Sequence, residues 1–279
     1  MATSQNKIDP NYLLSALEWH IDNDAQELWV DEPVDRTAIP VINKEKLPTP
    51  VTAPQKPQIQ NDKAAIELNP EPVMGAAQAI IEAQKIVSEC DSLEKLQEVI
   101  STFEGLSIKN TATNLVFSDG NPKSNIMVIG DAPNADDDSA GKAFQGITGQ
   151  LLDKIFACID LGRAQDNIEK SIYLTNLLNW RPPGNRTPTQ AEIDISLPFL
   201  QKHIELIKPK IIICFGATSA KTLMSKTESI SKLRGKFYEY NNIPLIVTYH
   251  PTYLIQTPAQ KRATWSDILM LQTKIGELS

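Results

Sequence analysis

The sequence predicts an α/β fold, a three-layer α/β/α sandwich around a central, mainly parallel four-stranded sheet. Short apolar runs bounded by turn residues indicate strands, and they are apolar at every position, as parallel strands covered on both faces are. Helical periodicity follows each run, so strands and helices alternate. The expected strands are 125–130, 171–176, 210–215 and 244–249. The expected helices of this unit are 147–159, 190–207, 217–224 and 259–276.

An N-terminal helix and a Pro-rich linker precede this unit. In residues 1–30, Leu13, Leu17 and Ile21 recur at helical spacing, which predicts a helical arm. Residues 31–74 hold eight of the nineteen prolines and few large apolar residues, which predicts a flexible, partly extended linker. The arm either binds a partner or docks on its own domain, and the sequence leaves both open.

The folded domain is expected over 75–279. It begins with helical patterns at 74–87 and 92–102, where Ser92 is the expected N-cap of the second helix. The net charge of −7 and the pI of about 5.1 do not by themselves suggest a nucleic-acid-binding protein. However, residues 1–102 hold 8 Lys+Arg against 17 Asp+Glu, whereas the rest holds 19 against 17. The acidity therefore belongs to the first third, and the remainder could carry a basic face.

The three cysteines, Cys90, Cys158 and Cys214, show no CxxC spacing. We expect buried, reduced thiols in a cytoplasmic protein. The N-terminus shows no signal peptide, and no apolar run approaches the roughly 18 residues that a membrane span needs. Membrane association is therefore not expected.

Each expected strand ends in a glycine or a polar residue. The first ends at Gly130-Asp131, the second at Asn176, the third at Gly216, and the fourth is followed by His250. Taken singly, Asn176 could cap a turn and His250 could be an ordinary loop histidine. Their convergence at the carboxyl edge of one sheet favours a ligand site, because α/β sheets bind ligands there.

The turn after the first strand holds four carboxylates in eight residues, from Asp131 to Asp138. Such a turn is either a solvated acidic loop or a site that uses the charge. Phe144 follows it and either packs in the core or forms a floor on which a flat ring stacks. Another loop, 181–189, combines three prolines with Arg181 and Arg186, a composition that suits phosphate contact.

Together these segments resemble the uracil-DNA glycosylase superfamily, and its family 4 most closely. The resemblance covers roughly 103–276, with the motifs in order. The matching segments are Gly130-Asp131-Ala132-Pro133-Asn134, Asp137-Asp138, Gly141-Lys142-Ala143-Phe144-Gln145-Gly146, residues 175–189 and His250-Pro251-Thr252-Tyr253-Leu254.

The resemblance implies a DNA glycosylase that flips uracil out of DNA and hydrolyses its N-glycosidic bond in base-excision repair. Asp131 and Asp137 are then the candidate catalytic carboxylates, and His250 would stabilise negative charge on uracil O2. The base would lie among Gly130, Asn134, Phe144 and Asn176, with Phe144 stacking on it and Asn176 reading its edge. The expected DNA contacts are Arg181, Arg186, Tyr253 and Leu254.

The chain departs from the family motif at three positions of this site. Asp131 and Asp137 replace glutamates, and Asn134 replaces a glycine, which would narrow the pocket beside uracil C5. These changes keep a second function open, a weakly active or inactive relative that binds DNA or a repair or replication partner. In that case the N-terminal helix would be the docking arm.

The positions that match the four cluster cysteines of family 4 carry no cysteine. They are Phe103, Leu106, Trp180 and Ser196. We expect these side chains to fill the space, so that no iron–sulfur cluster and no other metal is bound. The expected partners are uracil-containing DNA and a protein partner for the N-terminal helix, and the chain is expected to be a monomer.

Overall fold

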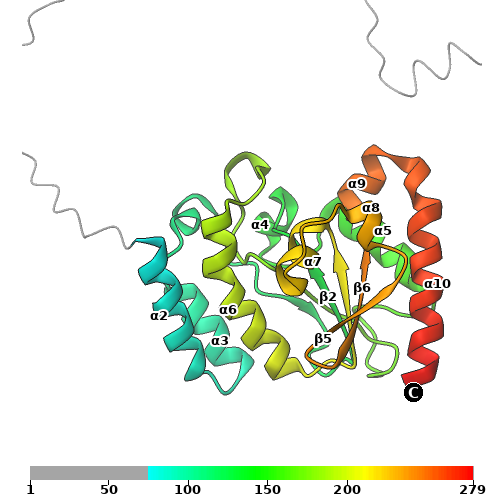
Figure 1. Cartoon of the computed structure of the whole chain (residues 1–279), viewed down its shortest axis with the longest axis horizontal. Helices are drawn as coiled ribbons and strands as arrows, with labels where there is room; N and C mark the ends of the chain where they lie inside the picture. Colours follow the sequence, from blue (N-terminus) through cyan, green and yellow to red (C-terminus); the bar gives the residue numbers. More distant parts are fainter. Residues whose placement is uncertain (1–74, 279) are drawn as a thin grey trace, which may run out of the picture. The chain divides into compact units, whose positions relative to one another are not determined.

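The computed structural model describes residues 75–278, so the arm and linker predicted over 1–74 lie outside the described residues. The described chain begins with two helices, α2 (Ala76–Ser88) and α3 (Leu93–Thr102), both packed against the long helix α6 (Gln190–Ile207) (Figure 1). The Ser92 side chain accepts a hydrogen bond from the Lys95 N–H, so it is the N-cap expected for α3.

A six-stranded sheet with the order β1-β3-β2-β4-β6-β5 forms the middle layer. Its four inner strands are parallel, as expected from their apolar runs. The strands are β1 (Asp119–Gly120), β2 (Ile126–Gly130), β3 (Tyr173–Asn176), β4 (Ile211–Phe215), β5 (Phe237–Tyr240) and β6 (Ile243–Thr248). The chain passes from β2 outward to β3 and then returns across β2 to β4, so the strand order reverses between β2 and β4.

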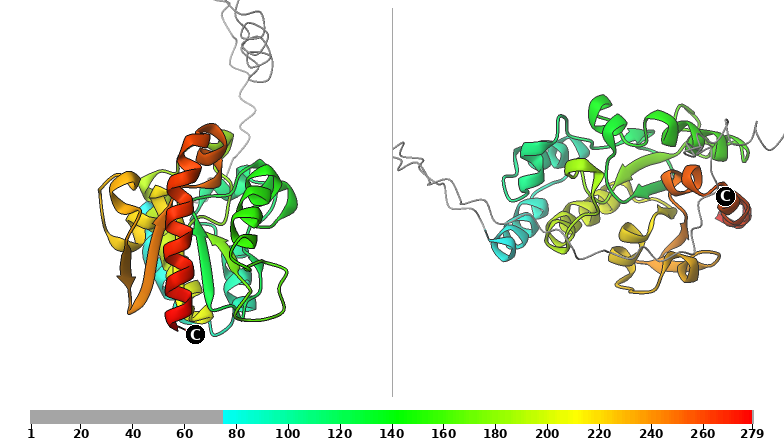
Figure 2. Two further views of the ribbon diagram at one scale, coloured as in Figure 1. Left: turned by 90° about the vertical axis from the view of Figure 1, so that its right-hand side faces the viewer. Right: turned by 90° about the horizontal axis from the view of Figure 1, so that it is seen from above.

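Successive residues of the inner strands point into two separate cores. Met127 and Ile129 of β2 belong to the core beneath α2, α3 and α6, whereas Ile126 and Val128 belong to the other. That second core lies beneath α5 (Gly146–Ala157) and α10 (Lys261–Leu278). The two further views show helices on both sides of the sheet (Figure 2), which makes the three-layer sandwich that the sequence predicts.

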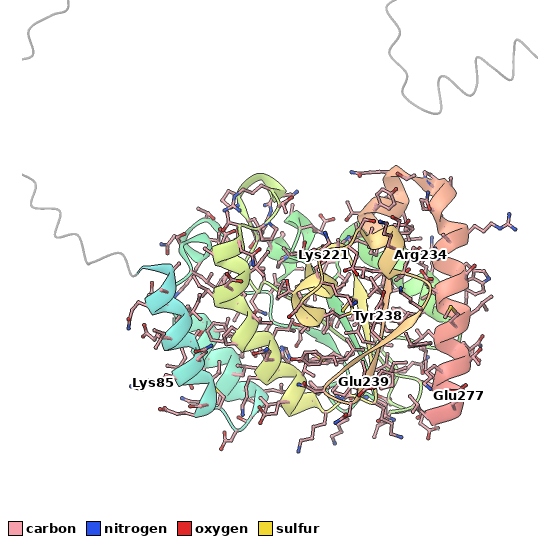
Figure 3. All side chains as sticks on the ribbon, in the orientation of Figure 1. Lys85, Lys221, Arg234, Tyr238, Glu239 and Glu277 are labelled. Atoms are coloured by element: carbon pink, nitrogen blue, oxygen red, sulfur yellow. The ribbon has the colours of Figure 1, made fainter. Side chains whose placement is uncertain are left out.

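The expected number of four strands is wrong, because an antiparallel strand pairs at each edge of the sheet. The two-residue strand β1 is too short to give a periodic signal. Strand β5 alternates poorly, since Tyr238 is only half-buried and Glu239 is exposed on the outer edge (Figure 3). Edge strands bury little area, so their sequences are weakly constrained.

Shorter helices complete the layers. They are α4 (Ala135–Ala140), α7 (Ala217–Met224), α8 (Ile230–Leu233), α9 (Pro251–Gln256) and the 3₁₀ turns Ser107–Thr111, Pro183–Asn185 and Pro258–Gln260. None of the helices in 75–278 is long and apolar enough to cross a membrane. Cys90 and Cys214 are buried as expected, but Cys158 is exposed. It caps the C-terminus of α5, just past the last buried side chain of that helix, Phe156.

His203 of α6 makes stability depend on pH. Its side chain is buried beneath the sheet, stacked on Phe117 and 2.7 Å from the Tyr173 hydroxyl. Burial lowers the His203 pKa to about 3 from an ordinary 6.5. The unfolded chain therefore takes up a proton below about pH 6.5 that the folded chain refuses, and stability falls by about 1.4 kcal/mol for each pH unit below that value.

We therefore expect His203→Gln to remove most of this acid sensitivity. Urea unfolding at pH 7 and pH 5 should show the stability advantage of the wild type over the variant shrinking by about 2 kcal/mol. A difference between the two proteins that stays constant across these pH values would contradict a neutral, buried His203.

Candidate functional site

The sheet register brings the strand ends of the predicted site together. Gly130 at the end of β2 is the direct partner of Asn176 at the end of β3. On the other side, Phe215 of β4 pairs with Thr248 of β6, two residues before His250. The four parallel strands therefore deliver an acidic turn, an amide and an imidazole to one edge, at the reversal of strand order.

Gly130, Asn176 and Phe144 form a tight cluster at this edge. A Cβ atom on Gly130 would lie 2.2 Å from Asn176 Oδ1 and 2.8 Å from Phe144 Cζ, so only glycine fits between them. Asn176 is 3% exposed, and its Nδ2 group has no hydrogen-bond partner among the described residues. A buried amide donor left unpaired costs free energy, so it marks a place where a polar ligand group can bind.

Phe144 has a strained backbone, with a φ angle of 54°. The neighbouring turn of α5 approaches so closely that a Cβ on Gly149 would lie 1.9 Å from the Phe144 carbonyl oxygen. The ring is buried, packs edge-to-face on Phe215, and stacks on His250 with centroids 5.8 Å apart at 28°. Phe144 is therefore a core residue whose ring also contacts His250 and lies beside Gly130 at the sheet edge.

A polar network that the sequence did not reveal holds this segment in place. Arg163 donates to the Ala143 carbonyl at 3.2 Å and to Asp119 at 2.8 Å. Gln145 donates through its side chain to the same Asp119 oxygen, at 3.1 Å. Asp119 and Arg163 are 44 positions apart, so no local pattern could have revealed the pair.

Asp137 is bound to the backbone around it. It is 3% exposed, and its two carboxylate oxygens accept hydrogen bonds from the backbone N–H groups of Asn134 and Gln145. Asn134 in turn caps α4, accepts from the Asp136 and Asp137 N–H groups, and donates to Thr148. Burial raises the Asp137 pKa above its ordinary value, and the hydrogen bonds from Gln145 and Asn134 oppose that rise. The pair is a reciprocal capping box.

Asp138 and the two predicted DNA-contacting arginines also have partners within the described chain. Asp138 accepts from the backbone N–H groups of Thr113 and Asn114, and Arg181 lies 3.8 Å away. Arg186 forms a bidentate pair with Glu192, at 2.6 and 2.9 Å. These contacts shape the 181–189 loop, and α6 begins with the expected Thr189–Glu192 capping box.

Asp131 is the member of the acidic turn that remains half-buried beside the cleft. Its Oδ1 atom accepts two hydrogen bonds from Ser219, one from the backbone N–H at 2.7 Å and one from the hydroxyl at 2.8 Å. Its Oδ2 atom has no hydrogen bond to a described residue. Ser219 belongs to α7 and lies 88 positions further along the chain, so no local pattern pointed to it.

His250 caps α9 through Nδ1, which lies 3.0 Å from the Thr252 hydroxyl and 3.3 Å from the Thr252 backbone N–H. When Nδ1 accepts the backbone hydrogen bond, the proton of the neutral ring is on Nε2. Burial lowers the His250 pKa, and the nearby Asp131 carboxylate works in the opposite direction. The ring is therefore neutral at pH 7. Its Nε2 atom takes no part in the contacts with Thr252 and can donate a hydrogen bond.

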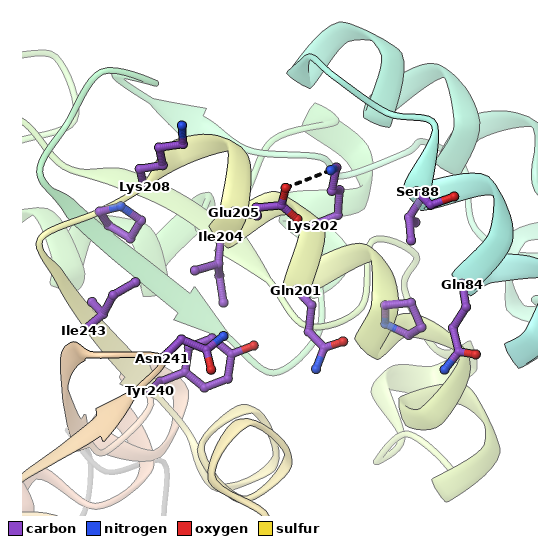
Figure 4. Close-up of a pocket in the computed structure, with 13 residues that line it drawn as sticks. Gln84, Ser88, Gln201, Lys202, Ile204, Glu205, Lys208, Tyr240, Asn241 and Ile243 are labelled. Atoms are coloured by element: carbon purple, nitrogen blue, oxygen red, sulfur yellow. Dashed lines mark hydrogen bonds and ion pairs between the residues drawn. The ribbon is translucent and has the colours of Figure 1, made fainter.

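Two cavities differ in what they contain. A groove of about 710 Å³ between α2, α6 and the β5–β6 hairpin, lined by side chains such as Gln201 and Tyr240, holds none of the predicted site residues (Figure 4). A cleft of about 340 Å³ instead brings together Asp131, Asn134, Arg186, His250 and Tyr253. The second cavity therefore holds the predicted residues Asp131 and His250, whereas Gly130, Phe144 and Asn176 do not line it.

Helix α9 presents a different apolar surface from the one expected. Tyr253 is 40% exposed and Ile255 is 36% exposed, but Leu254 is fully buried between α5 and α10. Consecutive helical residues point about 100° apart, so the three side chains cannot share one face. Leu254, predicted as a DNA contact, thus packs inside the protein in this structure.

The four positions that the resemblance equates with cluster ligands lie in the core between α3 and α6. Phe103, Leu106 and Trp180 belong to one apolar cluster, and Phe103 packs edge-to-face on Phe199 at 5.2 Å. Ser196 is 2% exposed and its hydroxyl has no partner among the described residues. These side chains offer no thiolate, so they do not fit an iron–sulfur cluster. Within 75–278, no group of three or more His, Cys, Asp or Glu residues could hold a metal ion.

Comparison with known proteins places this chain among uracil-processing enzymes. A family model described as "Uracil DNA glycosylase superfamily" matches residues 117–269, more than half of the chain. A type-4 uracil-DNA glycosylase of Sulfurisphaera tokodaii is 36% identical over 197 residues, covering 68% of this chain and 86% of that protein. The type-4 uracil-DNA glycosylase of Pyrobaculum aerophilum is 33% identical over 186 residues, covering 64% and 92%. That of Archaeoglobus fulgidus is 33% identical over 196 residues, covering 67% and 94%.

Proposed function

The chain belongs to the uracil DNA glycosylase superfamily, and from this premise we propose that it removes uracil from DNA by hydrolysing the N-glycosidic bond. The main observation in support is the buried amide of Asn176, which lies beside Gly130 and Phe144 and has no hydrogen-bond partner among the described residues. The glycine leaves the space, the ring supplies an apolar wall, and the amide supplies a donor that lacks a partner.

The amide reads the base by its hydrogen-bond pattern. Asn176 Nδ2 donates to uracil O4, while Oδ1 accepts from the uracil N3–H. Cytosine presents an amino donor and an unprotonated N3 at these positions, so both contacts would oppose like with like. Phe144 stacks against the base, which leaves the duplex because its glycosidic bond cannot be reached inside the stack.

His250 stabilises the leaving group. When the bond between C1′ of the sugar and N1 of uracil breaks, the electron pair stays on the base and negative charge develops on O2. A neutral imidazole with its proton on Nε2 donates a hydrogen bond to that oxygen. The lowered pKa suits this role, because the ring is already neutral and the N–H is fixed by the Thr252 contact at the other nitrogen.

Asp131 acts on the sugar side. The departing base leaves an oxocarbenium-like sugar, and a water molecule adds to C1′ to complete hydrolysis. The Asp131 carboxylate stabilises the positive charge and accepts a hydrogen bond from that water through Oδ2. We assign this role to Asp131 rather than Asp137, because Asp131 lines the cleft whereas Asp137 is 3% exposed and both its oxygens accept backbone N–H groups.

The DNA lies over the rim of the cleft. Tyr253 is exposed on α9 and lines the cleft, so it fills the space left in the base stack, in place of Leu254. Arg181 and Arg186 lie on the loop across the cleft, and a guanidinium paired with one carboxylate retains N–H donors for phosphate.

The enzyme works without an iron–sulfur cluster in this proposal, because an apolar plug and one serine occupy the cluster positions. We further propose a cytoplasmic monomer, in which the segment 1–30 either recruits a protein partner or docks on its own domain.

Uracil excision by metal-free protein is the experiment that tests the function. We expect full-length protein, purified anaerobically, to produce abasic sites in a uracil-containing oligonucleotide in the presence of EDTA. Matched oligonucleotides with thymine and hypoxanthine are the controls, and iron is quantified in the same sample. Iron at one cluster per chain would contradict the plug. DNA binding without any excision would favour the alternative, a DNA-binding relative that has lost catalysis.

A further inference from the structure

The Asp131 carboxylate is held by Ser219, a residue that follows a different strand. Ser219 gives Oδ1 two hydrogen bonds, through its backbone N–H at 2.7 Å and its hydroxyl at 2.8 Å. Ser219 is fully buried in the first turn of α7, which begins immediately after β4. The contact therefore bridges the two strands between which the strand order reverses.

Gly216 makes room for this arrangement. It has a φ angle of 124°, and a Cβ atom there would lie 2.4 Å from Asp131 Oδ2 and 2.6 Å from Oδ1. Any other side chain would push the carboxylate away from Ser219. Gly216 is also the N-cap of α7 and has no side chain to accept a hydrogen bond from the first turn, so Asp131 supplies that acceptor from another loop.

The two contacts leave the carboxylate with one fixed and one free oxygen. Two donors from one residue, at an angle to each other, restrict the rotation of the Asp131 side chain. Oδ2, without a hydrogen bond to a described residue, is left for the reaction in a cleft that Asp131 lines together with His250. A reacting group must be held within a fraction of an ångström to be effective.

We propose that Ser219 is a positioning residue, whose hydroxyl orients the Asp131 carboxylate toward the sugar and the attacking water. This inference rests on the proposed uracil-DNA glycosylase function. The competing explanation is that Asp131 only caps α7, in which case the Ser219 hydroxyl contributes to folding and not to the reaction. Both explanations predict the same static contacts, so a coupling measurement must separate them.

A double-mutant cycle of Ser219→Ala and Asp131→Asn provides that measurement. We expect Ser219→Ala alone to lower the single-turnover excision rate by about tenfold, the effect of one lost hydrogen bond to a charged group. KM should change less than about twofold, since the hydroxyl does not touch DNA. In the Asp131→Asn background, the same substitution should have no further effect on the rate.

The matched control is Thr222→Val on the same helix. The Thr222 hydroxyl bonds to the Thr218 carbonyl within α7 and does not contact Asp131. Its loss should leave the excision rate unchanged, although it removes a hydroxyl from the same helix. Melting temperatures of all five proteins, wild type included, show whether each variant is folded at the assay temperature.

Each outcome decides the proposal. Equal losses from Ser219→Ala in both backgrounds, or no loss in the wild-type background, would overturn the positioning role while leaving the glycosylase function standing. A wild type that excises no uracil would overturn the function and this inference together. The positioning role is supported if Ser219→Ala lowers the excision rate only when Asp131 is present and Thr222→Val leaves the rate unchanged.

Discussion

Replacing Asn176 by aspartate should lower kcat/KM for uracil excision by about 10⁴-fold, the penalty of a mismatched buried hydrogen-bond pattern. The carboxylate would face uracil O4 with an oxygen in place of the Nδ2 donor, which has no hydrogen-bond partner within residues 75–278. If the carboxylate is protonated, it presents a hydroxyl that can turn toward N3, and cytosine then becomes the base to test. Steady-state rates on matched oligonucleotides with uracil and cytosine measure the change.

Asn179 provides the control for this substitution. It lies three positions further on, is also buried, and donates its amide to the Val116 carbonyl at 3.1 Å. Asn179→Asp should lower stability, because a carboxylate would face that carbonyl, while the preference for uracil over cytosine stays unchanged. An Asn176→Asp variant that keeps the wild-type rate on uracil would show that this amide does not read the base.

The layers of the fold could be predicted because burial determines which residue types their strands and helices contain. The inner strands are covered on both faces and are apolar throughout, so β4, for example, was expected at 210–215 and lies at Ile211–Phe215. Helix α6 was expected at 190–207 and has those bounds, since Thr189 and Glu192 mark its start in the sequence. The edge strands, which bury little, left no comparable pattern.

Helix α4 was expected to be an acidic turn for a physical reason. Its sequence contains three consecutive aspartates, a residue type that competes with the helix backbone for hydrogen bonds. The helix forms because Asn134 caps it and because carboxylates in a first turn lie near the positive end of the helix dipole. Long-range contacts to Thr113, Asn114 and Gln145 then use two of those carboxylates.

The site followed from the sequence only in part. Parallel strands meet at one edge, so the neighbourhood of Gly130, Asn176 and His250 could be anticipated from their positions alone. The partners of these residues could not, because Ser219 and Arg163 reach the site from sequence distances that have no periodic signal. The sequence also did not show which side of α9 faces the core, because Tyr253, Leu254 and Ile255 are all largely apolar. Only the structure shows that Leu254 is the buried one.

Replacing Asp131 and Asp137 one at a time by asparagine, the isosteric amide, should affect the reaction rate and the stability differently. Asp131→Asn should lower kcat by about 10²- to 10³-fold, because it removes a charge from the place where the sugar cation develops. Its melting temperature should stay close to wild type, since an amide oxygen can still accept from Ser219. Single-turnover excision and thermal unfolding of the same preparation measure both effects.

Asp137→Asn should instead lower the stability and have a smaller effect on the excision rate. An amide can accept at only one of the two positions now facing the Asn134 and Gln145 N–H groups, so one of these hydrogen bonds is lost. We expect stability to fall by about 1–2 kcal/mol and the rate by less than about tenfold, through a displaced Phe144 segment. A large rate loss in Asp137→Asn with an unaffected Asp131→Asn would move the catalytic carboxylate to Asp137. That result would mean that the α4 cap opens when DNA binds, because in the described residues Asp137 is 3% exposed and both its oxygens accept backbone N–H groups.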